Sequence, residues 1–162
     1  MSGDGGSGGG GSSGTGTGRN GTVSTDRRQH GATWTLTSVA LVVRGPALDP
    51  DALTARLALR PTATRPPGPS RWGPPDDVDG EWRLQCDERT TRDFAAQLDT
   101  VLTAAEPYAE QWRALVAEGV SVALVVRGYV DNDSQLALTA EEMRRVARLG
   151  LPLTLTPSTS ER

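Results

Sequence analysis

The chain has 162 residues, a net charge of −3 and a single cysteine. This length allows one core, one cysteine excludes an intramolecular disulfide, and scattered basic residues on a slightly acidic chain give no positive stripe for nucleic acid. No apolar run approaches the roughly 20 residues that cross a bilayer, so we expect a cytoplasmic protein without nucleic-acid or membrane partners.

Residues 1–31 are mainly glycine, serine and threonine, with too little apolar side chain to offset the entropy of ordering. They also lack the basic and apolar regions of a secretory signal. We therefore expect a disordered tail at 1–31, a single α+β domain at 32–157 and a frayed C-terminus at 158–162. Every basic side chain is arginine, which together with abundant alanine, glycine and proline predicts a GC-rich, actinobacterial source.

One octapeptide, Ser-Val-Ala-Leu-Val-Val-Arg-Gly, occurs twice, at Ser38–Gly45 and at Ser121–Gly128. Each copy alternates and is rich in β-branched residues, which predicts strands over about 33–44 and 120–130. A third alternating segment at 81–87 places Trp82 and Cys86 on a core face, and a fourth strand is expected at 151–156.

Helix signals separate these strands. Asp49 with Pro50 predicts the start of a short helix that ends before Pro61. Helical spacing from 92 to 118 predicts a longer helix, which Pro107 should kink or split. Thr139 and Glu142 form a capping box for a helix through Leu149. Six prolines between 61 and 80 predict a long loop there.

The predicted order is β-α-β-α-β-α-β, two βαβ units joined by a long helix. Alternating strands favour a sheet with helices on one face and a second face left open. We therefore expect an α+β two-layer sandwich, a four-stranded ferredoxin-like fold with pseudo-two-fold symmetry. In such a fold the duplicated strands lie side by side and parallel at the centre.

The chain offers little for catalysis. Its only histidine, His30, falls in the predicted tail, and it has no lysine, so imidazole acid–base chemistry, Schiff bases and P-loop chemistry are not expected. Three acidic clusters, Asp49/Asp51, Asp76/Asp77/Asp79 and Asp131/Asp133, fit solvated turns better than a metal site, because they lack the pattern of a calcium loop. We expect no enzyme activity, cofactor or metal.

The open sheet face carries the candidate site. The alternation places Arg44, Arg83, Arg127 and Tyr129 on it, together with Trp34 if the register holds. Arginine and tyrosine on a platform of small residues are typical of the anchors of protein interfaces. Paired arginines could instead bind a carboxylate or phosphate, or could merely solubilise the face by pairing with Glu81 and Asp131.

Several short motifs resemble the bacterial family known as domain of unknown function 4279. They are Arg44–Gly45 leading into Leu48–Asp51, then Leu57–Thr62, Gly80–Leu84, Leu138–Thr139 and Leu149–Leu153. The resemblance spans about Trp34 to Thr156. It implies the limits of the domain and supplies no catalytic residue. Arg65–Gly68 replaces a Lys-Gly or Arg-Gly-Asp-like element of the family, and Thr156 replaces an aromatic residue.

The features together predict a non-catalytic binding domain that engages a protein partner through its open sheet face or through the proline-rich loop at 61–80. Small bacterial immunity proteins that neutralise toxins are an analogy for this role. A small-molecule or anion binder that uses the sheet-face arginines is the alternative. A carboxylate-dependent metal enzyme is a third, weaker hypothesis.

Overall fold

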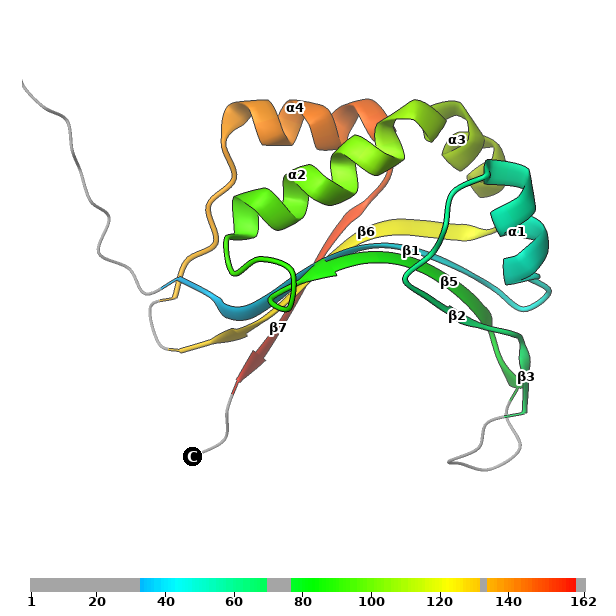
Figure 1. Cartoon of the computed structure of the whole chain (residues 1–162), viewed down its shortest axis with the longest axis horizontal. Helices are drawn as coiled ribbons and strands as arrows, with labels where there is room; N and C mark the ends of the chain where they lie inside the picture. The colour runs from blue at the N-terminus through cyan, green and yellow to red at the C-terminus, as the bar shows by residue number, and fades with distance from the viewer. Residues whose placement is uncertain (1–32, 70–76, 132–133, 160–162) are drawn as a thin grey trace, which may run out of the picture. The chain divides into compact units, whose positions relative to one another are not determined.

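The computed structural model describes residues 33–69, 77–131 and 134–159. The predicted tail at 1–31, with His30, lies outside these residues, as do Asp76 and Asp133. The described residues form an α+β fold whose main sheet has five strands in the order β2-β5-β1-β6-β7. Helices lie on one face of this arched sheet, and the concave face is open (Figure 1).

The strands are β1 (Thr35–Gly45), β2 (Ala63–Arg65), β3 (Gly68–Pro69), β4 (Asp77–Val78), β5 (Gly80–Asp87), β6 (Ser121–Val130) and β7 (Leu153–Thr159). The helices are α1 (Pro50–Leu57), α2 (Phe94–Ala105), the 3₁₀ turn η1 (Glu106–Tyr108), α3 (Ala109–Ala117) and α4 (Ala140–Leu149). None of the helices among the described residues is long and apolar enough to cross a membrane.

The duplicated octapeptides lie side by side in β1 and β6, but they run antiparallel, so the predicted parallel pairing is wrong. Leu41 pairs with Leu124, its own counterpart in the second copy, and Arg44 pairs with Ser121 as Ser38 pairs with Arg127. The two copies are therefore related by a local two-fold axis through the Leu41–Leu124 pair, perpendicular to the sheet.

The first predicted βαβ unit fails because α1 is too short to carry the chain back along the sheet. Its 8 residues span about 12 Å, whereas the 11 residues of β1 span about 36 Å. Helix α1 stays at one end of the sheet (Figure 1), and β5 begins beside the end of β1, where Gly80 pairs with Gly45. Strand β5 therefore runs antiparallel to β1. Only the second unit, β6-α4-β7, has the predicted parallel strands.

The helix boundaries predicted from capping residues are confirmed. Asp49 accepts hydrogen bonds from the backbone of Asp51 and Ala52 at the start of α1. Pro107 lies in the 3₁₀ turn that separates α2 from α3. Thr139 and Glu142 form the reciprocal capping box of α4, which ends at Leu149.

Two predictions about irregular segments are corrected. The proline-rich segment 61–80 is not only a loop, because Ala63–Arg65 pairs with β5 as an edge strand and Gly68–Pro69 pairs with Asp77–Val78. An edge strand tolerates nearby prolines because one of its sides needs no hydrogen-bond donors. The sheet consequently has five strands, not four. The last strand continues through Pro157 to Thr159, so 158–159 are paired with β6 and not frayed.

The core lies between the sheet and the helices and follows the predicted alternation. Trp82 and Trp112 are both fully buried, with ring centroids 5.9 Å apart. Cys86 is buried in the same cluster. The strand residues of the core are Val39, Leu41, Val43, Trp82, Cys86, Val122, Leu124 and Val126. Their neighbours in the sequence consequently point to the open face.

Trp34 does not lie on the open face, because β1 contains a bulge. Thr35 and Ser38 are three positions apart in the sequence, whereas their partners Tyr129 and Arg127 are two positions apart. The extra residue reverses the alternation, so Trp34 packs against the core. A Cβ atom on Gly128 would lie 3.0 Å from the Trp34 ring, so glycine leaves the space that the indole occupies.

Candidate functional site on the open sheet face

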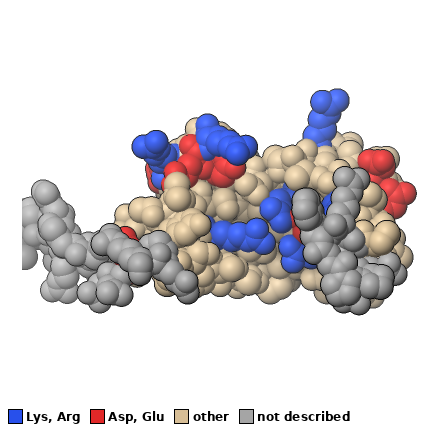
Figure 2. Space-filling view, turned by 90° about the horizontal axis from the view of Figure 1, so that it is seen from below, with Lys and Arg blue, Asp and Glu red and all other residues tan. Residues whose placement is uncertain are grey.

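The strand register places residues on the open face in rows that cross the sheet. One row contains Arg65, Glu81, Arg44 and Ser121, and a parallel row contains Asp87, Ser38, Arg127 and Thr156. The rows between them consist of Ala63, Arg83, Val42 and Ala123, and of Gln85, Ala40, Val125 and Thr154. Four arginines thus share this face with two acidic residues, and Figure 2 shows basic side chains gathered on it.

Glu81 forms ion pairs with three of these arginines. Its carboxylate lies 2.8 Å from Nε of Arg44, 2.6 Å from a terminal nitrogen of Arg83 and 3.7 Å from a terminal nitrogen of Arg65. The cause is register, because Arg44 and Arg65 flank Glu81 on the two neighbouring strands. The Glu81 side chain is only 11% exposed.

Burial would by itself raise the pKa of Glu81. The hydrogen bond from Arg44 and the positive charges of Arg83, Arg44 and Arg65 outweigh burial, so the pKa is lowered. Glu81 therefore stays ionised and cancels part of the positive charge at this end of the face.

A polar ladder continues along β5. Arg83 donates to the side chain of Gln85 at 3.4 Å, and Gln85 donates to Asp87 at 3.0 Å. Nε of Arg83 is buried and has no hydrogen-bond partner among the described residues. Arg83 is therefore fixed within the sheet surface and is only 20% exposed.

A shallow trough of about 220 Å³ crosses the other half of the face. Its floor is formed by Val42, Ala123 and Val125. Arg44 and Arg127 lie at its two ends. The hydroxyl residues along its sides are Ser121, Thr154 and Thr156. We call this hollow the arginine trough.

The structure brings the four predicted residues onto one face but not into one cluster. Arg44 and Arg127 line the arginine trough, whereas Arg83 belongs to the Glu81 cluster. Tyr129 is 45% exposed and lies one row beyond Arg127, opposite Thr35. The predicted pairing of sheet-face arginines with Glu81 is confirmed for Arg44 and Arg83.

Sequence reasoning missed Arg65 and the two threonines of the trough. Arg65 lies in a three-residue strand inside a proline-rich segment, so no alternation marked it. Thr154 and Thr156 alternate with leucines in β7, and this pattern does assign them to the face opposite the core. Their proximity to Arg127 depends on the parallel register with β6, which a single sequence does not specify.

The predicted acidic clusters form no metal centre in the part of the chain that the structure describes. No group there brings together three or more histidine, cysteine or acidic side chains. Asp49 already uses one carboxylate oxygen to cap α1. Asp76 and Asp133 lie outside the described residues, so their clusters are only partly described.

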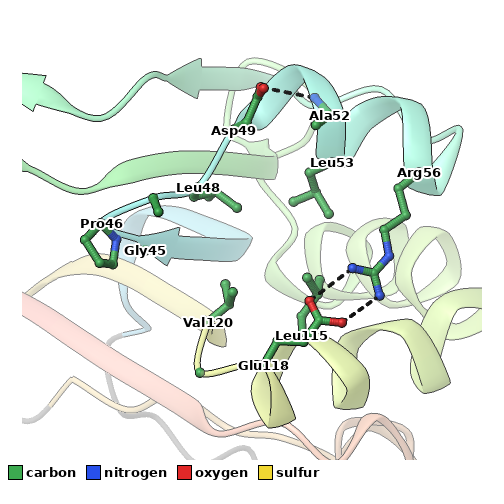
Figure 3. A pocket seen from close by; sticks show the side chains of 12 residues that line it. Gly45, Pro46, Leu48, Asp49, Ala52, Leu53, Arg56, Leu115, Glu118 and Val120 are labelled. Atoms are coloured by element: carbon green, nitrogen blue, oxygen red, sulfur yellow. Dashed lines mark hydrogen bonds and ion pairs between the residues drawn. The ribbon is translucent and has the colours of Figure 1, made fainter.

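A second hollow, of about 380 Å³, lies at the end of the sheet beside α1 (Figure 3). Leu48, Leu53 and Leu115 contribute apolar lining. Arg56 and Glu118 form an ion pair across it, in which the two terminal nitrogens of Arg56 donate to the two carboxylate oxygens of Glu118 at 3.2 and 3.1 Å. This hydrogen-bonded pairing raises the pKa of Arg56 and lowers that of Glu118. Both charges of the hollow's ion pair are thus satisfied within the chain.

No curated protein and no solved structure matches the chain. A family model does match, over residues 33–160, and these limits agree with those that the motif resemblance implies. The matched range includes every strand and helix described above. The chain therefore belongs to the family described as a domain of unknown function, DUF4279.

Proposed function

We propose that the domain is a non-catalytic protein-interaction module whose open sheet face binds an acidic surface of a partner protein. The observation that carries the proposal is a charge contrast: four arginines and two acidic residues share this face, in a chain with a net charge of −3. Electrostatic complementarity of this kind selects partners and accelerates association.

The packing of the face supports the same proposal. Its centre consists of short side chains, with Ala40 and Val42 only 6% and 4% exposed between the flanking side chains. Arginine around such a platform is enriched at interface anchors. The exposed Tyr129 adds an aromatic contact at the rim. A toxin neutralised by this domain would be one partner of this chemistry.

The test captures partners with the immobilised full chain from a lysate of the source organism, with cross-linking. Arg44→Glu combined with Arg127→Glu should lose a partner that the wild-type chain retains. Arg144→Glu with Arg148→Glu is the matched control, because it makes the same charge change on the exposed surface of α4. Capture of no specific protein, or equal capture by all three chains, would contradict the proposal.

Binding of a small anion is a second candidate function, favoured by the two arginines and three hydroxyls of the arginine trough. A ligand at a hundred times its dissociation constant should raise the free energy of unfolding by about 2.7 kcal/mol. A thermal-shift screen of metabolites and inorganic anions measures this effect. A screen without a single stabilising compound would remove this candidate.

A further inference from the structure

We infer that the arginine trough is a subsite for one side-chain carboxylate of the partner protein. This inference rests on the proposed function, and it adds the chemical group that is recognised and the place where it binds. Three features of the trough support it: its charge, its donors and its size.

The charge of the trough is only partly compensated, because Glu81 pairs with Arg44 from outside the trough and Arg127 has no such partner among the described residues. Its lining contains Arg44 and Arg127 but no acidic residue. Within the described part of the chain Arg127 forms no ion pair. A guanidinium without an ion-pair partner can bind a carboxylate from outside the chain.

Arg44 is held in place while its outer nitrogens stay available. Its Nε donates to Glu81, and its two terminal nitrogens have no hydrogen-bond partner among the described residues. The bond to Glu81 fixes the guanidinium at one end of the trough, which reduces the entropy lost when a ligand binds. Ser121, Thr154 and Thr156 add hydroxyl donors along the sides.

The size of the trough favours a side chain over a free metabolite. Its volume of about 220 Å³ is below the range of about 300–1,000 Å³ that is usual for small-molecule sites. It also lies in a sheet face, where a partner protein can present a side chain to it. A side chain presented by a partner protein needs no enclosure, because the rest of the interface excludes water around it.

The probe for this subsite is N-acetylglutamate amide, which carries a single side-chain carboxylate. N-acetylglutamine amide is the neutral control of the same shape. We expect the glutamate probe, added at constant ionic strength, to shift the Nε–Hε NMR resonances of Arg44 and Arg127, and the glutamine probe to leave them unchanged. Equal shifts with both probes, or no shift with either, would overturn the inference. So would shifts caused by inorganic phosphate and not by the glutamate probe.

Matched variants separate a local site from a general positive field. Arg127→Gln should raise the dissociation constant of the glutamate probe about tenfold, the usual effect of losing one charge-assisted contact. Arg65→Gln removes the same charge from the same face but lies outside the trough, so it should leave that constant within about twofold. Equal weakening by both variants would show simple screening and overturn the inference.

The two proposals fail in different ways. If the glutamate probe binds but no partner is captured, the carboxylate subsite stands and the protein-interaction function is lost. If a partner is captured and lost through Arg44→Glu with Arg127→Glu, yet the probe does not bind, the function stands and the carboxylate subsite is wrong.

Discussion

At the scale of single residues, Glu81 balances the charge of the open face. Its carboxylate is buried among three arginines that its register brings around it. Removing it would leave Arg44 without its hydrogen-bond acceptor and Arg83 without its ion-pair partner, at a cost of about 1.5–3 kcal/mol for a hydrogen bond to a charged group. Because the pKa of Glu81 is lowered in the folded chain, this contribution depends on pH.

The direction of that dependence follows from linkage. A lowered folded pKa means that Glu81 stabilises the fold above its ordinary pKa, and that the stabilisation disappears as pH falls through the folded value. Urea unfolding should therefore show wild type more stable than Glu81→Gln near pH 6, with a gap that narrows as the pH falls below the ordinary glutamate pKa of about 4.3. A gap that persists unchanged in acid would contradict this account.

Ala58 is a second residue with a local consequence. It ends α1 with φ of 51°, in the left-handed region where a Cβ atom is unfavourable. Ala58→Gly should raise the free energy of unfolding by about 0.5–1 kcal/mol. The same substitution at Ala52, inside the helix, should lower it by about 1 kcal/mol. Chemical denaturation of both variants checks the opposite signs, and destabilisation by Ala58→Gly would refute the argument.

At the scale of elements, Arg145 joins α4 to the end of α2. It donates from Nε to Glu106 at 2.7 Å and from a terminal nitrogen to Asp99 at 2.6 Å. A further terminal nitrogen donates to Thr103 at 3.1 Å. The hydrogen bonds to Glu106 and Asp99 raise the pKa of Arg145. The side chain is only 19% exposed, so this network is less screened than a surface pair.

Arg145→Met keeps most of the aliphatic stem and removes the charge. It should lower the free energy of unfolding by about 1–2 kcal/mol, because the two-point ion pair with Glu106 and the ion pair with Asp99 are lost together. Arg144→Met, which breaks only an exposed pair with Glu141, should stay within about 0.5 kcal/mol. Urea unfolding of both variants and the wild type, at low and high salt, measures these changes in the free energy of unfolding. Equal effects of the two variants would show that the network adds no stability.

Elements with a local cause were predictable from the sequence. Capping by Asp49, the break at Pro107 and the capping box of Thr139 each depend on residues within a few positions, and all three are confirmed. The arrangement of strands depends on partners far along the chain. Alternation in β1 and β6 is identical whether they pair parallel or antiparallel, so the sequence left their direction open.

In the candidate site, too, the features with a local cause were predictable and those that depend on distant parts of the chain were not. Alternation correctly assigns Arg44 and Arg127 to the open face, because it needs only the side-chain period of a strand. The bulge beside Leu36 reversed the face of Trp34, and no turn residue in the sequence marks it. The arginine trough itself depends on two registers, β1 with β6 and β6 with β7, which only the folded chain determines.

At the scale of the whole molecule, the apolar core and the arginines of the open face lie on opposite sides of the sheet. Helices cover the side that contains Trp82 and Trp112, and this side carries the stability of the domain. The other side carries the arginines of the open face (Figure 2). Substitution of Arg127, which forms no ion pair among the described residues, should leave the melting temperature close to that of the wild type, whereas substitution of Arg44 should lower it because Glu81 loses a hydrogen-bond donor. Differential scanning calorimetry of both variants checks this.

The local two-fold axis through Leu41 and Leu124 has a consequence for assembly of the chain. Since each octapeptide is a complete antiparallel partner for a copy of itself, β1 of one unfolded molecule can pair with β1 of another in the register that β6 normally occupies. Such strands are apolar and β-branched, the composition that promotes intermolecular pairing. Refolding yield after dilution from urea should thus decline as protein concentration rises, with exchanged dimers visible by size-exclusion chromatography. The repeat that builds the centre of the sheet is also the segment most exposed to mispairing before the sheet is complete.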